Sequence, residues 1–324
     1  MWNGSLLSPP LGQIGVPEAG ADLGGMLALP PGGKVLYVRG NGTSPTAYSD
    51  DPAGLAEKLY PSVALALAGC VSGRGDRIIA LPGHTENIAK ADAWPFVAGV
   101  KIIGMGSGTL RPTFTWTVTA STLLMSVANV GIANCQLLME PGTGAVSVTT
   151  PMTISAAGCS IIGCRIRMST DVNNLAPGGI VTTIAADDLT LVGNKILGAT
   201  AGAGVLLTLV GADRLYMRDN MFKGASTGVT VGVVVFSGTP STDIWLEGNT
   251  YINKLASSQY AVTASVDACS GVSRNEHFST LDNAATNTTL LPWGTYRGLM
   301  TFHRPTVSNA VGEVGSENVG LVSA

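Results

Sequence analysis

Apolar and polar positions alternate through the middle of the chain in a pattern that returns every 26–30 residues. Six segments align on one position, called the anchor here, which is occupied by Cys135, Cys164, Asn194, Asn220, Asn249 and Asn275. Consecutive anchors are 29, 30, 26, 29 and 26 residues apart. Most anchors have an apolar residue three positions before them and another two positions after them, so the alternation changes phase at the anchor. This predicts two short strands that meet at a corner, each with one buried face.

Each repeat also contains a second apolar segment that is long enough for a strand. These segments are residues 145–148, 180–184, 205–210, 229–236 and 260–266. Two or three short strands with turns, repeated at this period, form one coil of a solenoid. The sequence therefore predicts an all-β protein, a right-handed parallel β-helix of about seven coils. A β-sandwich with chance similarity between its strands is the alternative.

Asparagine at four successive anchors has a physical explanation. Asparagine tolerates the left-handed backbone conformation, and its amide can bond backbone groups of the next coil. Because stacked coils lie about 4.8 Å apart, these amides would align into a ladder. Cys135 and Cys164 would occupy the same column with a small apolar group. The predicted structural ladder is Cys135, Cys164, Asn194, Asn220, Asn249 and Asn275.

The two ends of the chain depart from this period. Residues 35–38 are expected to form a strand, and residues 61–70 an apolar helix that caps the open end of the solenoid and hides its unpaired edge. The expected division is an arm over 1–33, a capping strand, helix and first coil over 34–99, the β-helix over 100–284 and a second arm over 285–324. The arms would order against a partner or wrap back on their own solenoid.

Composition narrows the possible functions. Hydrophobic residues make up 45% of the chain and charged residues 12%, which calls for a long solenoid core, a buried oligomer interface or both. The net charge of −3, without a Lys/Arg cluster, argues against nucleic-acid binding, and no apolar run is long enough to span a membrane. The five cysteines form no CxxC pair and no secretory signal precedes them, so we expect reduced thiols in a protein made in a cytoplasm.

Outward-facing positions next to the anchors form a strip along the solenoid. The strip is apolar or small in the early coils and becomes aromatic and charged in the later ones. The candidate oligomer face on it is Ile162, Val192, Tyr216 and Trp245. A continuous apolar strip is typical of a contact surface, and three-fold association about a parallel axis would bury it. Alternatively, an arm or a loop of the same chain covers the strip.

Candidate catalytic chemistry is sparse. A polysaccharide-degrading β-helix needs clustered carboxylates, either for hydrolysis or for a cation site. Asp187 and Asp213 each lie seven residues before an anchor and Asp243 lies six before one, which makes this column a weak saccharide or cation candidate. Turn residues that bond their own backbone are the alternative. His84 and Glu86 lie in a Pro-Gly turn without a third partner. We assign no catalytic residue, metal ligand or cofactor and expect no enzymatic activity.

The opening of the solenoid resembles a known group of proteins. The stretches that carry the resemblance are Lys-Val-Leu-Tyr-Val-Arg at 34–39, Gly-Asn-Gly-Thr at 40–43, Gly-Asp-Arg-Ile-Ile-Ala-Leu-Pro-Gly-His at 75–84 and Val-Lys-Ile-Ile-Gly-Met-Gly-Ser-Gly at 100–108. They look like the start of phage virion proteins with a pectate-lyase-like β-helix, and the resemblance covers residues 34–280. That group includes tailspike-like proteins and capsid decoration (cement) proteins, commonly homotrimers.

The resemblance implies a structural protein on the capsid surface of a virion, made in the host cytoplasm. It would be a homotrimer that stabilises a phage head, with its terminal arms contacting the major capsid protein. A tailspike or receptor-binding protein is the alternative, as is a polysaccharide lyase or hydrolase.

Overall fold

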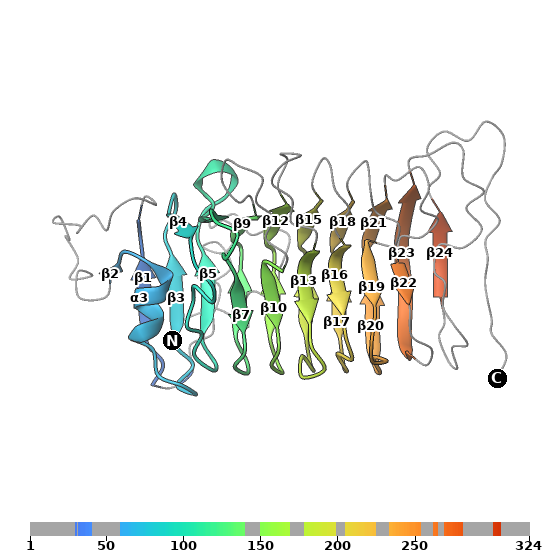
Figure 1. Ribbon diagram of the computed structural model, residues 1–324, viewed down its shortest axis with the longest axis horizontal. Coiled ribbons are helices and arrows are strands. Elements are labelled where there is room, and N and C mark those ends of the chain that lie inside the picture. The colour runs from blue at the N-terminus through green and yellow to red at the C-terminus, as the bar shows by residue number, and fades with distance from the viewer. Residues whose placement is uncertain are drawn as a thin grey trace, which may run out of the picture.

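The protein is a stack of parallel strands along one axis (Figure 1). This computed structural model describes residues 30, 32–40, 59–139, 150–168, 178–198, 205–224, 233–253, 262–264, 269–280 and 301–305. Every strand pairing within them is parallel and joins strands that follow one another along the stack. The predicted all-β parallel β-helix is therefore confirmed.

The coils have three faces, and each face is one parallel sheet. The first sheet consists of β1 (Val35–Val38), β3 (Arg77–Ala80), β5 (Lys101–Gly104), β8 (Gly131–Ala133), β11 (Ser160–Ile162), β14 (Thr190–Val192), β17 (Tyr216–Arg218), β20 (Ile244–Glu247) and β23 (Gly271–Thr280). The second consists of β4 (Thr85–Ile88), β6 (Thr113–Trp116), β9 (Gln136–Met139), β12 (Arg165–Met168), β15 (Lys195–Leu197), β18 (Met221–Lys223), β21 (Thr250–Asn253) and again β23. The third consists of β7 (Leu123–Met125), β10 (Met152–Ile154), β13 (Gly178–Thr182), β16 (Val205–Leu209), β19 (Val234–Phe236) and β22 (Val262–Ala264).

Equivalent side chains of successive coils stack on one another inside the solenoid. In the first sheet the inward column runs through Ile102, Ile132, Ile161, Leu191, Met217 and Leu246. In the second sheet the rings of Phe222 and Tyr251 stack 5.4 Å apart and 6° from parallel. These columns belong to one continuous apolar cluster that extends from Leu36 to Cys269. The single rod-shaped interior is where the large apolar fraction of the sequence goes.

The N-terminal end differs in detail from the prediction. The helix α3 (Val63–Ala68) is shorter than the expected 61–70, because the Ser62 side chain caps its first turn and Gly69 ends it. It packs against β1, β3 and the short β2 (Leu59–Tyr60) at that end of the stack, as Figure 1 shows. The helix buries Val63, Ala66 and Leu67 against the stack, whereas Leu65 on its other side is 53% exposed. A 3₁₀ turn, Gly108–Leu110, follows β5.

The number of complete coils is smaller than the predicted seven. Within the described residues, five coils carry one strand on each of the three faces, from β7–β9 to β19–β21. The earlier coils lack a strand in the third sheet, and in the next coil the long β23 serves both the first and the second sheet. The strand β24 (Thr301–Pro305) pairs with β23, although it lies within the predicted C-terminal arm. Residues 1–29, 31, 285–300 and 306–324 of the two predicted arms, and residues 145–148, lie outside the described part of the chain.

Candidate functional site

Three asparagine side chains form a hydrogen-bonded column at the corner between the first and second sheets. The backbone N–H groups of Asn194 and Asn220 each donate to the Oδ1 of the next asparagine in the column, Asn220 and Asn249, over 3.0 Å in both cases. The Nδ2 groups of Asn194 and Asn220 donate to the same oxygens at 2.9 Å. At most 1% of each of these residues is exposed.

Each asparagine also bonds the preceding coil. The Nδ2 of Asn220 donates to the carbonyl of Leu191 at 2.7 Å, and Asn194 and Asn249 make the equivalent bonds to Ile161 and Met217 at 2.8 and 3.0 Å. The side-chain amide of Asn220 therefore bonds both the preceding and the following coil, and all of its donors and acceptors have partners. This is the coil-to-coil bonding expected of a ladder.

The backbone conformation at the corner shows that one of the two reasons given for asparagine at the anchors, its tolerance of the left-handed conformation, is wrong. The left-handed residues are the ones directly before the anchors, namely Asn134, Gly163, Gly193, Asp219 and Gly248, with φ between 51° and 66°. The anchors 194, 220 and 249 are not among the positive-φ residues. Asparagine is therefore used at the anchor for its side-chain bonds and not for its tolerance of the left-handed conformation.

The thiols at the start of the column partly replace the amides. Cys164 lies 3.7 Å from the carbonyl of Ile132 through its Sγ, in the place where the ladder asparagines donate their Nδ2. Its backbone N–H donates to Oδ1 of Asn194 at 2.9 Å, so the ladder begins here. Cys135 is also buried, and its Sγ lies 3.2 Å from the carbonyl of Ala133. All five cysteines are free thiols, and burial raises the pKa of Cys164 to about 11.

The prediction of Asn275 as the last residue of the ladder is wrong. The register places Thr250 opposite His277, so that Glu276, and not Asn275, follows Asn249 in the column. The Oε1 of Glu276 accepts from the backbone N–H and the Nδ2 of Asn249, at 3.3 and 3.2 Å. The final repeat is 27 residues long in both sheets, one more than the alignment on asparagine assumed. Glu276 is 1% exposed.

Two residues of the predicted oligomer face are buried within the single chain. Ile162 is 3% and Val192 0% exposed, in an outward-facing apolar cluster with Ile79, Ile103 and Ala133. Arg111, from the loop after β5, reaches the carbonyl of Gly163 beside this cluster at 3.2 Å. The prediction of an exposed strip is therefore wrong at Ile162 and Val192, because side chains of the same chain pack around it.

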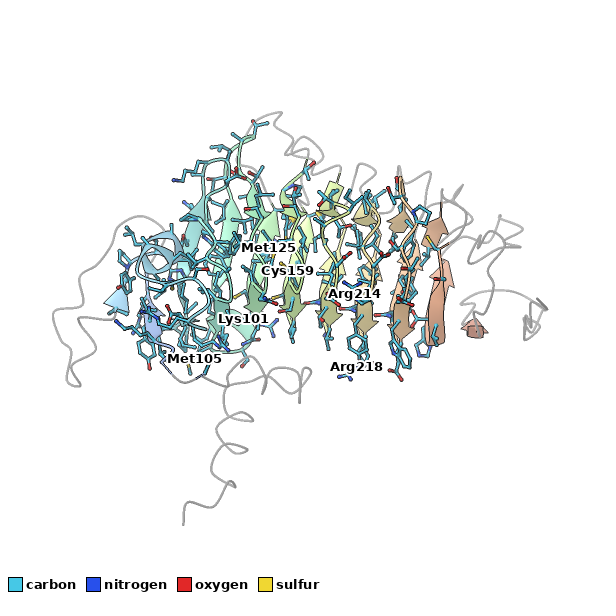
Figure 2. All side chains as sticks on the ribbon, turned by 90° about the horizontal axis from the view of Figure 1, so that it is seen from below. Lys101, Met105, Met125, Cys159, Arg214 and Arg218 are labelled. Atoms are coloured by element: carbon cyan, nitrogen blue, oxygen red, sulfur yellow. The ribbon has the colours of Figure 1, made fainter. Side chains whose placement is uncertain are left out.

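The strip emerges at the surface in the later coils. Tyr216 and Trp245 lie opposite each other on β17 and β20 and are both half-buried. Arg218 Nη1 donates to the Tyr216 hydroxyl at 3.1 Å, and Trp245 Nε1 donates to Oε2 of Glu247 at 3.2 Å. Figure 2 shows Arg218 on the same side of the stack as Lys101 and Met105. Aromatic rings and charged groups thus alternate over two neighbouring coils of this face.

The acidic column is a set of turn residues. The Oδ1 of Asp187 accepts from the backbone N–H of Asp213 at 3.2 Å, and the Oδ1 of Asp213 accepts from that of Thr242 at 2.7 Å. Asp243 does not continue this column, because it adopts the left-handed corner conformation shared by Asp188 and Arg214, one position further along.

The side chain of Arg214 neutralises the carboxylates at this corner. The Arg214 guanidinium donates to both oxygens of Asp188, at 2.7 and 2.9 Å, and to Asp187 at 3.3 Å. Hydrogen bonding from Arg214 lowers the pKa of Asp188. The carboxylates therefore bond backbone groups and an arginine, which matches the turn alternative and leaves less capacity for a cation or a saccharide.

His84 and Glu86 make structural contacts at the N-terminal end. His84 Nδ1 accepts from the N–H of Gly40 at 2.8 Å, so the neutral ring carries its proton on Nε2, 3.2 Å from Oε2 of Glu86. The Glu86 carboxylate also accepts from the N–H of Val63 at 2.8 Å and from Nε1 of Trp94 at 3.2 Å. This pair joins β4 to the first turn of α3.

Sequence reasoning missed one further buried carboxylate, Asp76. It is 0% exposed and accepts from the N–H groups of Lys34 and Val71 at 2.8 and 2.9 Å and from Arg74. Burial acts to raise its pKa, but these hydrogen bonds outweigh burial and lower the pKa to about 2. Asp76 follows Gly73 and Gly75, and nothing in the neighbouring sequence indicated that its side chain is buried.

Comparisons with protein-family profiles, with curated protein sequences and with solved structures found no match for this chain. Within the described residues no group of three or more His, Cys, Asp or Glu side chains could hold a metal ion. The helices found in the same part of the chain are too short or too polar to cross a membrane. The class defined by the fold is the parallel β-solenoid with an internal asparagine ladder.

Proposed function

We propose that this protein is a structural component of a phage particle, a homotrimeric cement protein that decorates and stabilises the capsid. The structural observation on which the proposal rests is that the polar side chains of the corners bond between coils. Asn220, Asp213 and Arg214 all bond between coils, so these polar groups serve to join one coil to the next. A rod built in this way suits a mechanical role.

The predicted partners are part of the same proposal. The protein associates with itself as a trimer and contacts the major capsid protein through its terminal segments, on the outer surface of a virion made in the host cytoplasm. The resemblance of residues 34–108 to the opening of phage β-helix proteins supports this origin. The low charged fraction of 12% supports an interface that removes more apolar surface from water.

Binding to purified phage heads tests the proposal. We expect the protein to bind expanded heads, to leave unexpanded heads unbound, and to raise the temperature at which the expanded heads rupture. Light scattering after size exclusion should give a mass three times the 33.0 kDa of one chain. A monomer that binds neither form of head would contradict the proposal. Polysaccharide turnover that Asp213→Ala abolishes would replace it with an enzymatic function.

A second function, glycan recognition by a tailspike or receptor-binding protein, is favoured by the Tyr216 and Trp245 pair. Neighbouring coils lie about 4.8 Å apart, so the two side chains could contact successive sugar rings. Aromatic faces bind the apolar faces of sugars, and the adjacent Arg218 and Glu247 can bond hydroxyl groups. Binding to host surface polysaccharide that Trp245→Ala abolishes, and that Leu110→Ala at an exposed apolar position elsewhere preserves, would favour this function.

A further inference from the structure

The ladder ends in a group of different chemistry from the one that builds it. Each interior asparagine accepts hydrogen bonds at its Oδ1 and donates its Nδ2 to the preceding coil. Glu276 occupies the next place and accepts from Asn249 through Oε1, but an ionised carboxylate has no proton to donate. Only the protonated carboxyl can both accept and donate as the amides do.

The surroundings of Glu276 favour that protonated form. No donor of good geometry among the described residues reaches its Oε2. The nearby hydroxyl of Tyr251 and the charge of Glu247 both act on the carboxyl. Burial is the larger effect and, with the charge of Glu247, raises the pKa of Glu276 to about 7, whereas the nearby Tyr251 hydroxyl and the hydrogen bonds from Asn249 oppose this shift. Burial likewise raises the pKa of Tyr251.

The position of Glu276 connects this chemistry to the end of the molecule. Strand β23 carries the residue and closes both the first and the second sheet. The last strand, β24, pairs with β23, and their register shifts between Ser273 and Glu276. In this pairing His303 lies opposite Glu276, and Arg304 opposite His277. On the neighbouring strand β20, Glu247 lies opposite Arg274.

We propose that Glu276 is a proton-controlled latch that holds the last coil of the solenoid. With the carboxyl protonated, β23 is bonded to the ladder and β24 stays paired with it. When the carboxyl ionises, a negative charge is left in the buried interior, where burial disfavours it, and the last coil opens locally. The proposal goes beyond the structural role in a virion and does not depend on it.

The direction of the effect follows from the two states of the protein. In an opened coil the carboxyl is solvated and its pKa returns toward the ordinary value of 4.5. The closed coil therefore binds more protons between pH 4.5 and about 7, so closure weakens as the pH rises through this window and changes little above it.

Hydrogen–deuterium exchange of the full chain tests the latch. Exchange would be measured from pH 5.5 to 8.5 and corrected for the intrinsic pH dependence of amide exchange. We expect protection of peptides from 271–280 and 301–305 to fall about ten- to a hundredfold across this range, whereas peptides from 190–197 keep theirs. Glu276→Gln, which keeps an acceptor and supplies a donor, should hold the last coil closed at every pH.

Two matched variants separate the latch from other titrations. Asp219→Asn removes a carboxylate that is exposed at a neighbouring corner and should keep the wild-type pH response. His303→Gln should also keep it. Loss of the response in His303→Gln, or its persistence in Glu276→Gln, overturns the proposal.

Carbon NMR of the glutamate side-chain carboxyls in the wild-type protein gives a test that requires no variant. One carboxyl should titrate near pH 7. Titration of every glutamate below about pH 5.5 would refute the latch, because the normal range for this side chain lies well below neutrality.

Discussion

At the scale of single residues, the corner side chains act between coils and not within one. Asn220 is the clearest case, because its amide bonds Leu191 in one coil and Asn249 in another and its Oδ1 accepts from Asn194. Buried polar groups are costly only when they lose their partners. The stability of the rod therefore depends on the continuity of the column more than on any one bond.

Asn220→Ala should lower the free energy of unfolding by about 2–4 kcal/mol. The substitution leaves the backbone N–H of Asn194 and one of its two Nδ2 hydrogens without an acceptor at a buried corner, and it removes one donor from the carbonyl of Leu191. Chemical denaturation followed by circular dichroism measures the change. Lys195→Ala, at an exposed position one residue after an anchor, should change stability by less than about 0.5 kcal/mol. Equal effects of the two substitutions would contradict the role of the ladder.

The thiols should be unreactive in the folded protein. Burial and the nearby charge of Asp76 raise the pKa of Cys70 to about 11, and burial likewise raises the pKa of Cys135, Cys159 and Cys164. Because the thiolate is the nucleophile, alkylation at pH 8 should be much slower than for a free cysteine. Mass spectrometry after iodoacetamide treatment measures it: we expect no rapid labelling of these four residues before unfolding and complete labelling afterwards.

The sequence predicted the ladder where the repeat was regular and missed it where the repeat changed length. Asn194, Asn220 and Asn249 stand in segments with clear apolar alternation, so their register could be read directly. The segment 270–279 has weak alternation, and Asn275 matched the residue type while Glu276 held the position. A longer carboxylate that reaches the same bonds leaves no signal in the sequence.

At the scale of elements, short strands become coils because the corners impose a sharp change of direction. The corner residues adopt positive φ, and glycine, asparagine or aspartate occupies that place in every coil from Asn134 to Gly248. These residue types reach the left-handed region at least cost. Corner chemistry thus sets where each strand of three to five residues ends.

Gly248→Val should destabilise the protein by about 1–3 kcal/mol, because a β-branched residue is strained at φ 66°. A Cβ at this position would also come 2.7 Å from Oδ1 of Asp219, which can rotate away. Gly248→Asn places a residue of the type found at the equivalent Asn134 and should cost clearly less. Differential scanning calorimetry of the two variants measures the difference. A valine variant as stable as the asparagine variant would contradict the corner argument.

Elements without a periodic pattern were harder to predict. The strand at 35–38 was predicted at its observed bounds, whereas α3 is four residues shorter than the expected 61–70, because Ser62 and Gly69 end it on both sides. The outward strip was expected to be exposed at Ile162 and Val192, since alternation shows only which residues leave the interior of a coil. It does not show that these outward side chains pack against one another from coil to coil and are buried within the single chain.

At the scale of the whole molecule, two buried carboxylates at opposite ends make stability depend on pH in opposite directions. Asp76, near the N-terminal end, has its pKa lowered to about 2, and Glu276, near the C-terminal end, has its pKa raised to about 7. The first group favours the folded state only when ionised, and the second only when protonated. Neither effect could be read from the sequence, because each depends on burial and on partners from other coils.

The melting temperature should therefore pass through a maximum near pH 4, between the ordinary values of the two carboxyls. The ordinary pKa of an aspartate is 3.8, whereas the pKa of folded Asp76 is about 2. Between these two values the unfolded chain binds a proton at this residue and the folded protein does not, so the stability falls as the pH is lowered. The ordinary pKa of a glutamate is 4.5, whereas folded Glu276 keeps its proton until about pH 7. Between these two values the folded protein binds a proton that the unfolded chain has lost, so the stability also falls as the pH rises, by about 1–3 kcal/mol in all.

Calorimetry from pH 2 to 9 measures both limbs. Glu276→Gln should flatten the limb between pH 4.5 and 7 and leave the acid limb intact, whereas Asp76→Asn should flatten the acid limb at the cost of general stability, because its amide cannot accept all the bonds that the carboxylate accepts. A curve that rises monotonically to pH 7 in the wild-type protein would show that Glu276 ionises freely in the folded state, and that the end of the ladder is open to water.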